Sequence, residues 1–219
     1  MSIDPAIGGP AGRTYPARFS VDPAEEVARW RPLVNWLLAV PHLAVVQALQ
    51  AVAQALSVVS WFAILFTGRV PSGVAEFQAM YVRYALRTAT FVGFLREEYP
   101  PFAFATTTAD PGDDPRTRVD VVPDTGERDR VSVAFRLILA IPHLLVLAAL
   151  AVALVVVAVI GAVVVIVTGA WPPGLRDFAV GVGRWWLRVE AYLLLLTDEY
   201  PPFTLDDVPA PPAAAPGVA

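Results

Sequence analysis

The sequence predicts an all-α integral membrane protein, built from two parallel tandem repeats of about 101 residues with about four transmembrane helices. Composition is the first observation behind this prediction. Only 16% of the 219 residues are charged and the mean hydropathy is +0.56, whereas about a quarter of the residues are charged in a typical soluble domain. Two long uncharged blocks and an internal repeat are the other two observations.

The repeat is visible as identities at a constant offset. Pro41-His42-Leu43 recurs as Pro142-His143-Leu144, an offset of 142 − 41 = 101. The same offset relates further identical residues: Thr67-Gly68 to Thr168-Gly169, Arg83 and Arg87 to Arg184 and Arg188, and Glu98-Tyr99-Pro100-Pro101-Phe102 to Glu199-Tyr200-Pro201-Pro202-Phe203. We therefore expect four parts: repeat 1 over 15–104, an acidic cytoplasmic linker over 105–130, repeat 2 over 131–207 and a disordered Pro/Ala tail over 208–219.

Each repeat begins with alternating apolar residues and continues with an uncharged block. The alternation is typical of a short strand, and we expect pieces near 17–21, 102–106, 118–122 and 203–205 to form a small cytoplasmic sheet. The uncharged blocks, 32–68 and 137–175, are 37 and 39 residues long. A helix needs about 20 apolar residues to cross the hydrocarbon core. Each block therefore predicts one span, kinked or begun at Pro41 and Pro142.

A second helix follows in each repeat, over about 74–95 and 175–196, and carries arginines on one face. Such a helix either lies at the interface or spans the bilayer with its arginines against protein or trapped water. An arginine in the middle of a lipid-facing span costs roughly 2.5–3.5 kcal/mol, so a lipid-facing stripe is excluded. We favour spanning. The following Tyr-Pro-Pro-Phe ends the helix because two prolines cannot continue it.

Counting arginines predicts the orientation. The first repeat is preceded by Arg13, Arg18, Arg29 and Arg31, and the linker region holds Arg96, Arg116, Arg118, Arg128, Arg130 and Arg136. The opposite loops hold only Arg69 and Arg176. We expect a multi-pass protein of the inner (cytoplasmic) membrane with N- and C-termini in the cytoplasm, in which the two repeats are parallel and not inverted.

Composition also excludes several functional classes. The absence of cysteine excludes disulfides, thiol nucleophiles and iron–sulfur clusters. The net charge of −4 argues against a nucleic-acid partner. The exclusive use of arginine as the basic residue indicates a GC-rich, bacterial genome. The sequence contains neither a catalytic Ser–His–Asp order nor a metalloprotease or dinucleotide motif, so we predict no enzyme, no catalytic residue, no cofactor and no metal.

The residues of three motifs resemble a known family. Residues 61–71 (Trp-Phe-Ala-Ile-Leu-Phe-Thr-Gly-Arg-Val-Pro), the paired Pro-His-Leu and the segment Leu-Leu-Thr-Asp-Glu-Tyr-Pro-Pro-Phe at 195–203 look like a bacterial membrane family catalogued as domain of unknown function 4389, often found as tandem copies. The second copy departs from this pattern near Gly161-Ala162-Val163, and Trp171 replaces Val70. The resemblance implies the architecture and no activity.

Seven ionisable residues are candidates for function. His42 and His143 hold equivalent positions beside a proline; they are potential ligands that meet on a pseudo-twofold axis, or imidazoles that bond a carbonyl freed by the proline or lie in the membrane interface. Arg83, Arg87, Arg184 and Arg188 form i, i+4 pairs suited to the phosphate of an anionic lipid, or a stripe satisfied by water, headgroups and acidic residues. Glu190, opposite that stripe and replaced by Ala89 in repeat 1, is either an ion-pair partner of Arg29, Arg31 or Arg136, or a proton site.

These observations predict a non-enzymatic membrane scaffold or assembly protein that contacts lipid through the arginine stripe. Its partners are then the bilayer, an anionic lipid, and an unknown membrane protein or further copies of the chain. The alternative is a small transporter or channel that acts as an oligomer, because duplicated helical units with buried charges are common in transporters.

Overall fold

The computed structural model describes residues 15–24, 26–124 and 126–208, and each repeat in it contributes one strand and three helices. Repeat 1 contains β1 (Ala17–Val21), α1 (Arg31–Leu38), α2 (Val40–Thr67) and α3 (Ser72–Val92). Repeat 2 contains β2 (Thr117–Val121), α4 (Arg130–Ala134), α5 (Arg136–Thr168) and α6 (Pro173–Leu193). The predicted repeat and the predicted helices are therefore present, at boundaries close to those expected.

Glycine and proline set the ends of the long helices. α2 ends at Gly68 and α5 at Gly169, both with left-handed backbone at φ of 77° and 83°, a conformation that glycine adopts without a steric penalty. Pro41 lies in the first turn of α2, where its missing N–H has no helical partner to lose. Pro142 lies inside α5, which begins six residues before it.

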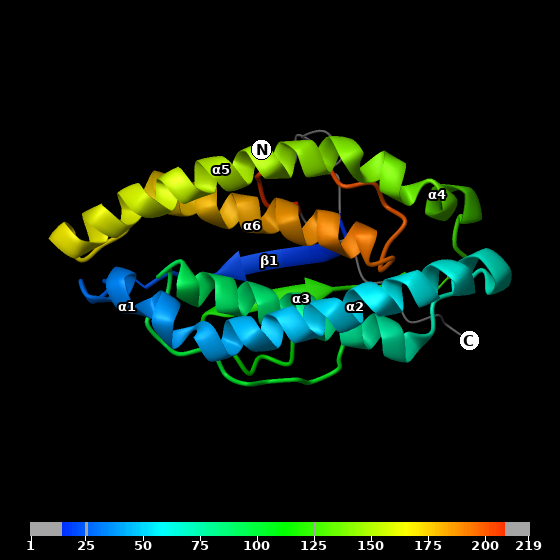
Figure 1. The fold of residues 1–219 in the computed structure, drawn as a ribbon, viewed down its shortest axis with the longest axis horizontal. Helices are drawn as coiled ribbons and strands as arrows, with labels where there is room; N and C mark the ends of the chain where they lie inside the picture. The colour runs from blue at the N-terminus through cyan, green and yellow to red at the C-terminus, as the bar shows by residue number, and fades with distance from the viewer. Residues whose placement is uncertain (1–14, 25, 125, 209–219) are drawn as a thin grey trace, which may run out of the picture.

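The two strands form an antiparallel hairpin with Phe19 opposite Val119. The predicted strands at 17–21 and 118–122 are thus confirmed within one residue, whereas 102–106 and 203–205 are not strands. Each strand covers the helix of the other repeat, since β1 packs on α6 and β2 packs on α3. In Figure 1, α5 and α6 lie on one side of β1 and α2 and α3 on the other.

The long helices α2 and α5 run antiparallel to each other; the prediction of parallel repeats concerns the side of the membrane on which each repeat begins and stays a prediction. In Figure 1, α2 begins at the end of the molecule where α5 finishes. Backbone hydrogen bonds tie these ends together, from Val27 N to Gly169 O at one end and from Arg128 N to Gly68 O at the other. Arginine counting reports on which loops share a side of the membrane, and it contains no information on how the two repeats pack.

The elements form three layers. α3 and α6 contact each other in the middle, and 13 of the 21 residues of α3 and nine of the 21 residues of α6 are buried. The hairpin covers one side of this pair, against the arginine-bearing faces of both helices. α2 packs on α3 and α5 on α6, on the side away from the hairpin. The core between the layers includes Phe19, Val119, Leu86 and Leu187.

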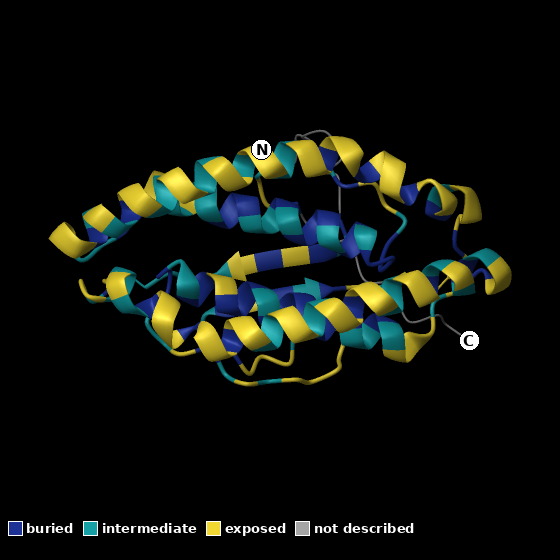
Figure 2. Cartoon of the chain, viewed as in Figure 1, coloured by how far each residue is buried: buried dark blue, intermediate teal, exposed yellow. Residues whose placement is uncertain are grey.

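α2 and α5 expose apolar surface along their whole length, as the yellow bands in Figure 2 show. Only four of the 28 residues of α2 and five of the 33 residues of α5 are buried. Exposed side chains include Val58 and Phe66 on α2, and Leu145 and Val155 on α5. Within the described residues these two helices are long and apolar enough to cross a membrane; α3 and α6 do not reach that hydropathy.

Candidate functional site

The first pair of predicted arginines binds the two strands of the hairpin. Arg83 Nε donates to Val119 O at 3.4 Å and Arg184 Nε donates to Phe19 O at 3.2 Å. Because Phe19 and Val119 are opposite each other in the hairpin, the two arginines hold the central residue pair from both sides. Arg83 also donates to the carbonyl groups of Ala105, Thr107, Thr108 and Ala109.

The second pair binds the segments that follow each Tyr-Pro-Pro-Phe motif. Arg87 lies 2.9 Å from Asp110 and 2.7 Å from Asp113, whereas Arg188 donates to the carbonyl groups of Thr204 and Asp206. Arg83, Arg87 and Arg188 are at most 3% exposed. These arginines use their donors inside the protein, so the predicted contact with a lipid phosphate does not fit the structure. Arg184 alone is half-buried.

Two acidic residues that the sequence reasoning treated as solvated are part of this network. Asp110 and Asp114 have fully buried side chains and accept hydrogen bonds from the strand amides of Val119 and Thr117, each at 2.8 Å. Asp114 also accepts from Arg96 Nη1 at 2.5 Å. The signal was present as Asp-Pro-Gly-Asp-Asp, a turn sequence in which a short side chain bonds nearby amides; the Gly112 amide donates to Asp110 in this way.

The two histidines form equivalent clusters with the aromatic residues of the repeat. The His42 ring stacks on Phe102 with centroids 4.1 Å apart, and its Nδ1 lies 2.6 Å from the Tyr84 hydroxyl. His143 stacks on Phe203 at 4.0 Å and accepts a hydrogen bond from Trp185 at its Nδ1. The recurrence of Pro-His-Leu and Tyr-Pro-Pro-Phe is thereby explained, because the two motifs pack against each other.

Neither a meeting of the two histidines on an axis nor a hydrogen bond to a carbonyl freed by proline fits these contacts. They lie at opposite ends of the molecule, because α2 and α5 are antiparallel and each histidine is near the start of its helix, so they do not meet on the axis. Their Nδ1 atoms bond side chains of α3 and α6 and not a carbonyl freed by proline. Both rings are fully buried, and each Nε2 lacks a partner among the described residues. Those residues contain no cluster of three potential metal ligands.

Glu190 contacts a tyrosine of the other repeat. Its neighbour is Tyr81 on α3, and none of the arginines proposed as its partner forms an ion pair with it in the described part of the chain. Arg136 instead donates to Tyr192 O, Thr197 O and Asp198. Burial raises the pKa of Glu190 to about 7, and the Tyr81 hydroxyl offsets only part of this rise. Glu190 is therefore a group that titrates near neutral pH between the repeats.

Together, the fold and these clusters define a duplicated, mostly helical protein with two apolar helices long enough to cross a membrane and a small polar hairpin. Comparison with family models places it more closely: the domain of unknown function DUF4389 matches at residues 29–103 and again at 130–204. The chain belongs to this family and contains two copies of its domain. Neither the curated proteins nor the solved structures gave a match.

Proposed function

We propose that this chain is a membrane-bound scaffold that lies flat on the bilayer. In this arrangement the exposed faces of α2 and α5 enter the apolar part of one leaflet, and the hairpin layer faces water. The proposal rests on the three layers of the fold, of which one outer layer is apolar and the other polar. A protein with these two unlike faces matches an interface between lipid and water.

The path of the chain between the repeats carries the proposal. Arg116 bonds Asp22 at the end of the molecule where α2 begins, and Arg128 lies at the other end, beside Gly68. The thirteen residues from Arg116 to Arg128 that join these ends include Arg118, Asp120, Asp124 and Glu127. If α2 and α5 crossed the bilayer, this segment, which comprises β2 and the charged irregular stretch after it, would lie at membrane depth, where exposed irregular backbone is not tolerated in contact with lipid.

The helix lengths support the flat arrangement. It places every loop on one aqueous side, including the loops of Arg69 and Arg176 that counting arginines assigned to the opposite side. α2 and α5 are about 42 and 50 Å long at 1.5 Å per residue, longer than the hydrocarbon core of about 30 Å. A helix in the plane of the membrane has no such limit on its length.

Labelling of single cysteines tests the arrangement directly, because the natural chain has no cysteine. Ser20→Cys lies on the hairpin, Ser72→Cys at one end and Asp177→Cys at the other, and all three positions are exposed. In sealed inverted and right-side-out vesicles we expect a membrane-impermeant maleimide to label all three from one side only. Val58→Cys and Val155→Cys, on the apolar faces, are the controls and stay unlabelled from both sides until detergent is added.

Labelling of Ser72→Cys and Asp177→Cys from opposite sides would overturn the flat arrangement. It would favour spanning helices in an oligomer whose polar hairpins line a water-filled space, which is the transporter or channel alternative. The uninterrupted apolar surface of α5 is the observation that favours this second candidate. Ion or solute flux into proteoliposomes separates a channel from a scaffold, since a scaffold gives the flux of protein-free vesicles.

A further inference from the structure

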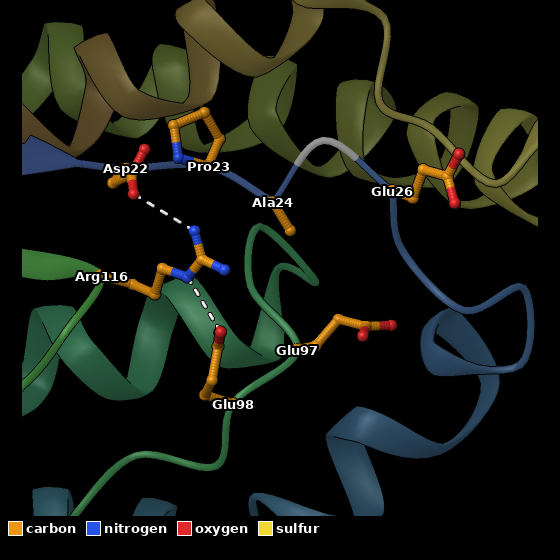
Figure 3. Close-up of a pocket in the computed structure, with 7 residues that line it drawn as sticks. All are labelled: Asp22, Pro23, Ala24, Glu26, Glu97, Glu98 and Arg116. Carbon is orange, nitrogen blue, oxygen red and sulfur yellow. Dashed lines mark hydrogen bonds and ion pairs between the residues drawn. The ribbon is translucent and has the colours of Figure 1, made fainter.

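A polar cavity opens at the end of the molecule where α1 begins, between residues 22–26 and 97–98 (Figure 3). Its volume is about 430 Å³, and a neighbouring cavity of about 450 Å³ shares Glu26 and Glu97 with it. Arg116 bonds Asp22 at 3.2 Å and Glu98 at 2.9 Å across one wall. The Glu97 side chain points away from this pair in the close-up.

Glu97 holds only part of the hydrogen bonds that its carboxylate can accept. Its Oε1 accepts from the Ala28 amide at 2.6 Å, and no arginine of the described chain lies within 4 Å of it. Glu26, on the opposite wall, is exposed and also lacks an ion pair among these residues. Glu98 Oε2 is buried without a partner in the described structure. Arg116 therefore pairs with Glu98 and Arg29 lines the neighbouring cavity, but Glu26 and Glu97 form no ion pair among the described residues.

The carboxylate of repeat 2 that is equivalent to Glu97 shows which groups this position binds when arginines are present. Asp198 is equivalent to Glu97 by the 101-residue offset, and its Oδ2 accepts from the amide of Asp129 just as Glu97 accepts from Ala28. Asp198 Oδ1 in addition accepts from the guanidinium groups of Arg128, at 2.7 Å, and Arg136. These two arginines are almost completely buried.

Repeat 1 has lost both of these guanidinium groups. The offset places Val27 where repeat 2 has Arg128, and Asn35 where it has Arg136. Val27 borders the cavity of about 450 Å³, so the space that an arginine side chain fills in repeat 2 is part of a cavity in repeat 1. The carboxylate, its backbone anchor and the space are retained, whereas the cations are missing.

We propose that this cavity binds an arginine side chain of a partner protein, which occupies the position of Arg128 in the other repeat. A guanidinium group there makes charge-assisted hydrogen bonds with Glu97 and with Glu26 or Glu98. The occupant is a basic segment with an exposed arginine, and the planar fork of the guanidinium favours arginine over lysine. The inference adds a partner to the proposed scaffold, and its test in detergent does not depend on how the chain lies in the membrane.

Calorimetric titration of the full chain in mild detergent tests the proposal. The probe is an end-blocked Gly-Arg-Ala-Arg-Gly peptide, and the matched control peptide has citrulline at both arginines, which keeps the shape and removes the charge. We expect saturable binding of the arginine peptide, weakened at least tenfold by citrulline and by Glu97→Gln, and weakened as salt is raised. Asp207→Asn, which removes an exposed acid paired with Arg18 elsewhere on the molecule, leaves binding unchanged.

A second variant uses the repeat itself as the template. Val27→Arg with Asn35→Arg copies repeat 2 and supplies the missing guanidinium groups from within the chain, so we expect it to abolish peptide binding. If this double variant does not fold, peptide binding by Glu97→Gln alone tests the proposal. Equal binding of the citrulline peptide, or unchanged binding by Glu97→Gln, would overturn the proposal. Competition by micromolar calcium, with binding of calcium alone, would instead identify a metal site and would also refute it.

Discussion

The buried ion pair between Arg96 and Asp114 gives the sharpest prediction for stability. Both side chains are fully buried and 2.5 Å apart. Asp114→Asn keeps the oxygen that accepts from the Arg116 and Thr117 amides but turns an NH2 group toward the guanidinium. Removing one partner of a buried pair leaves an uncompensated charge, which costs about 3–5 kcal/mol.

This cost is large enough to measure by thermal unfolding in mild detergent. A chain of this length loses about 2–4 °C of Tm per kcal/mol, so we expect Asp114→Asn to lower Tm by about 6–20 °C. The matched control is Asp207→Asn, which breaks an ion pair with Arg18 whose side chains are 47% and 45% exposed. Exposed pairs are worth about 0–1 kcal/mol, so the control shifts Tm by at most about 4 °C.

The second repeat supplies the double-mutant cycle. Thr197 stands at the position equivalent to Arg96, so the fold accommodates threonine there. Arg96→Thr combined with Asp114→Asn removes the unpaired cation, and we expect the double variant to be more stable than Asp114→Asn alone. If Asp114→Asn matched the control, or if the two substitutions were simply additive, the assignment of this pair as a buried, coupled contact would be wrong.

Three further predictions follow from other contacts. Glu190 has a pKa of about 7 in the fold against an ordinary value of 4.5, so its ionisation opposes folding: the stability it permits is complete below about pH 4.5 and falls by roughly 3 kcal/mol as the pH rises to 7. In unfolding titrations, Glu190→Gln should be more stable than the natural chain at pH 8 and as stable as the natural chain at pH 4.5. A variant no more stable than the natural chain at pH 8 would contradict this prediction. Gly161→Ala places a Cβ 2.2 Å from the Trp171 ring and should lower the free energy of unfolding by about 1–3 kcal/mol. Adding Trp171→Val, which copies Val70 of repeat 1, should restore most of this loss. A single variant as stable as the natural chain would refute the clash. Gly169→Ala, at φ of 83°, should lower the free energy of unfolding by about 1–2 kcal/mol. The control Gly73→Ala, whose Cβ meets no atom within 4 Å in the first turn of α3, should be neutral or stabilising. Equal effects of the two substitutions would show that backbone strain at Gly169 is absent.

The sequence predicted the local structure well because local structure depends on short-range patterns. Alternating residues at 17–21 and 117–121, the Thr-Gly turns and the uncharged blocks each correspond to an element at nearly the predicted position. The repeat offset also relates equivalent contacts of the two halves. His42 and His143, for example, stack on phenylalanines that are themselves 101 residues apart.

The arrangement of the repeats could not be predicted from the same patterns. It depends on which helix each strand covers and on the irregular segment between α3 and β2, and neither leaves a periodic signal in the sequence. Acidic residues in a segment rich in proline and glycine resemble a solvated linker, so the burial of Asp110 and Asp114 was missed. The arginines were singled out from the sequence, but their partners were not: those of Arg83 lie 22 to 36 residues away and that of Arg184 lies 165 residues away.

The exchange of strands between the repeats has a consequence for synthesis of the chain. β2 emerges from the ribosome after α3, the helix it covers, whereas β1 emerges about 165 residues before Arg184, the α6 residue that binds Phe19. At about 5–20 residues per second, β1 waits roughly 8–33 seconds for its helix. The first half of the chain therefore cannot complete its fold until the second half has been made. Any factor that binds the apolar surface of α2 during this interval binds a chain in which β1 has not yet packed on α6.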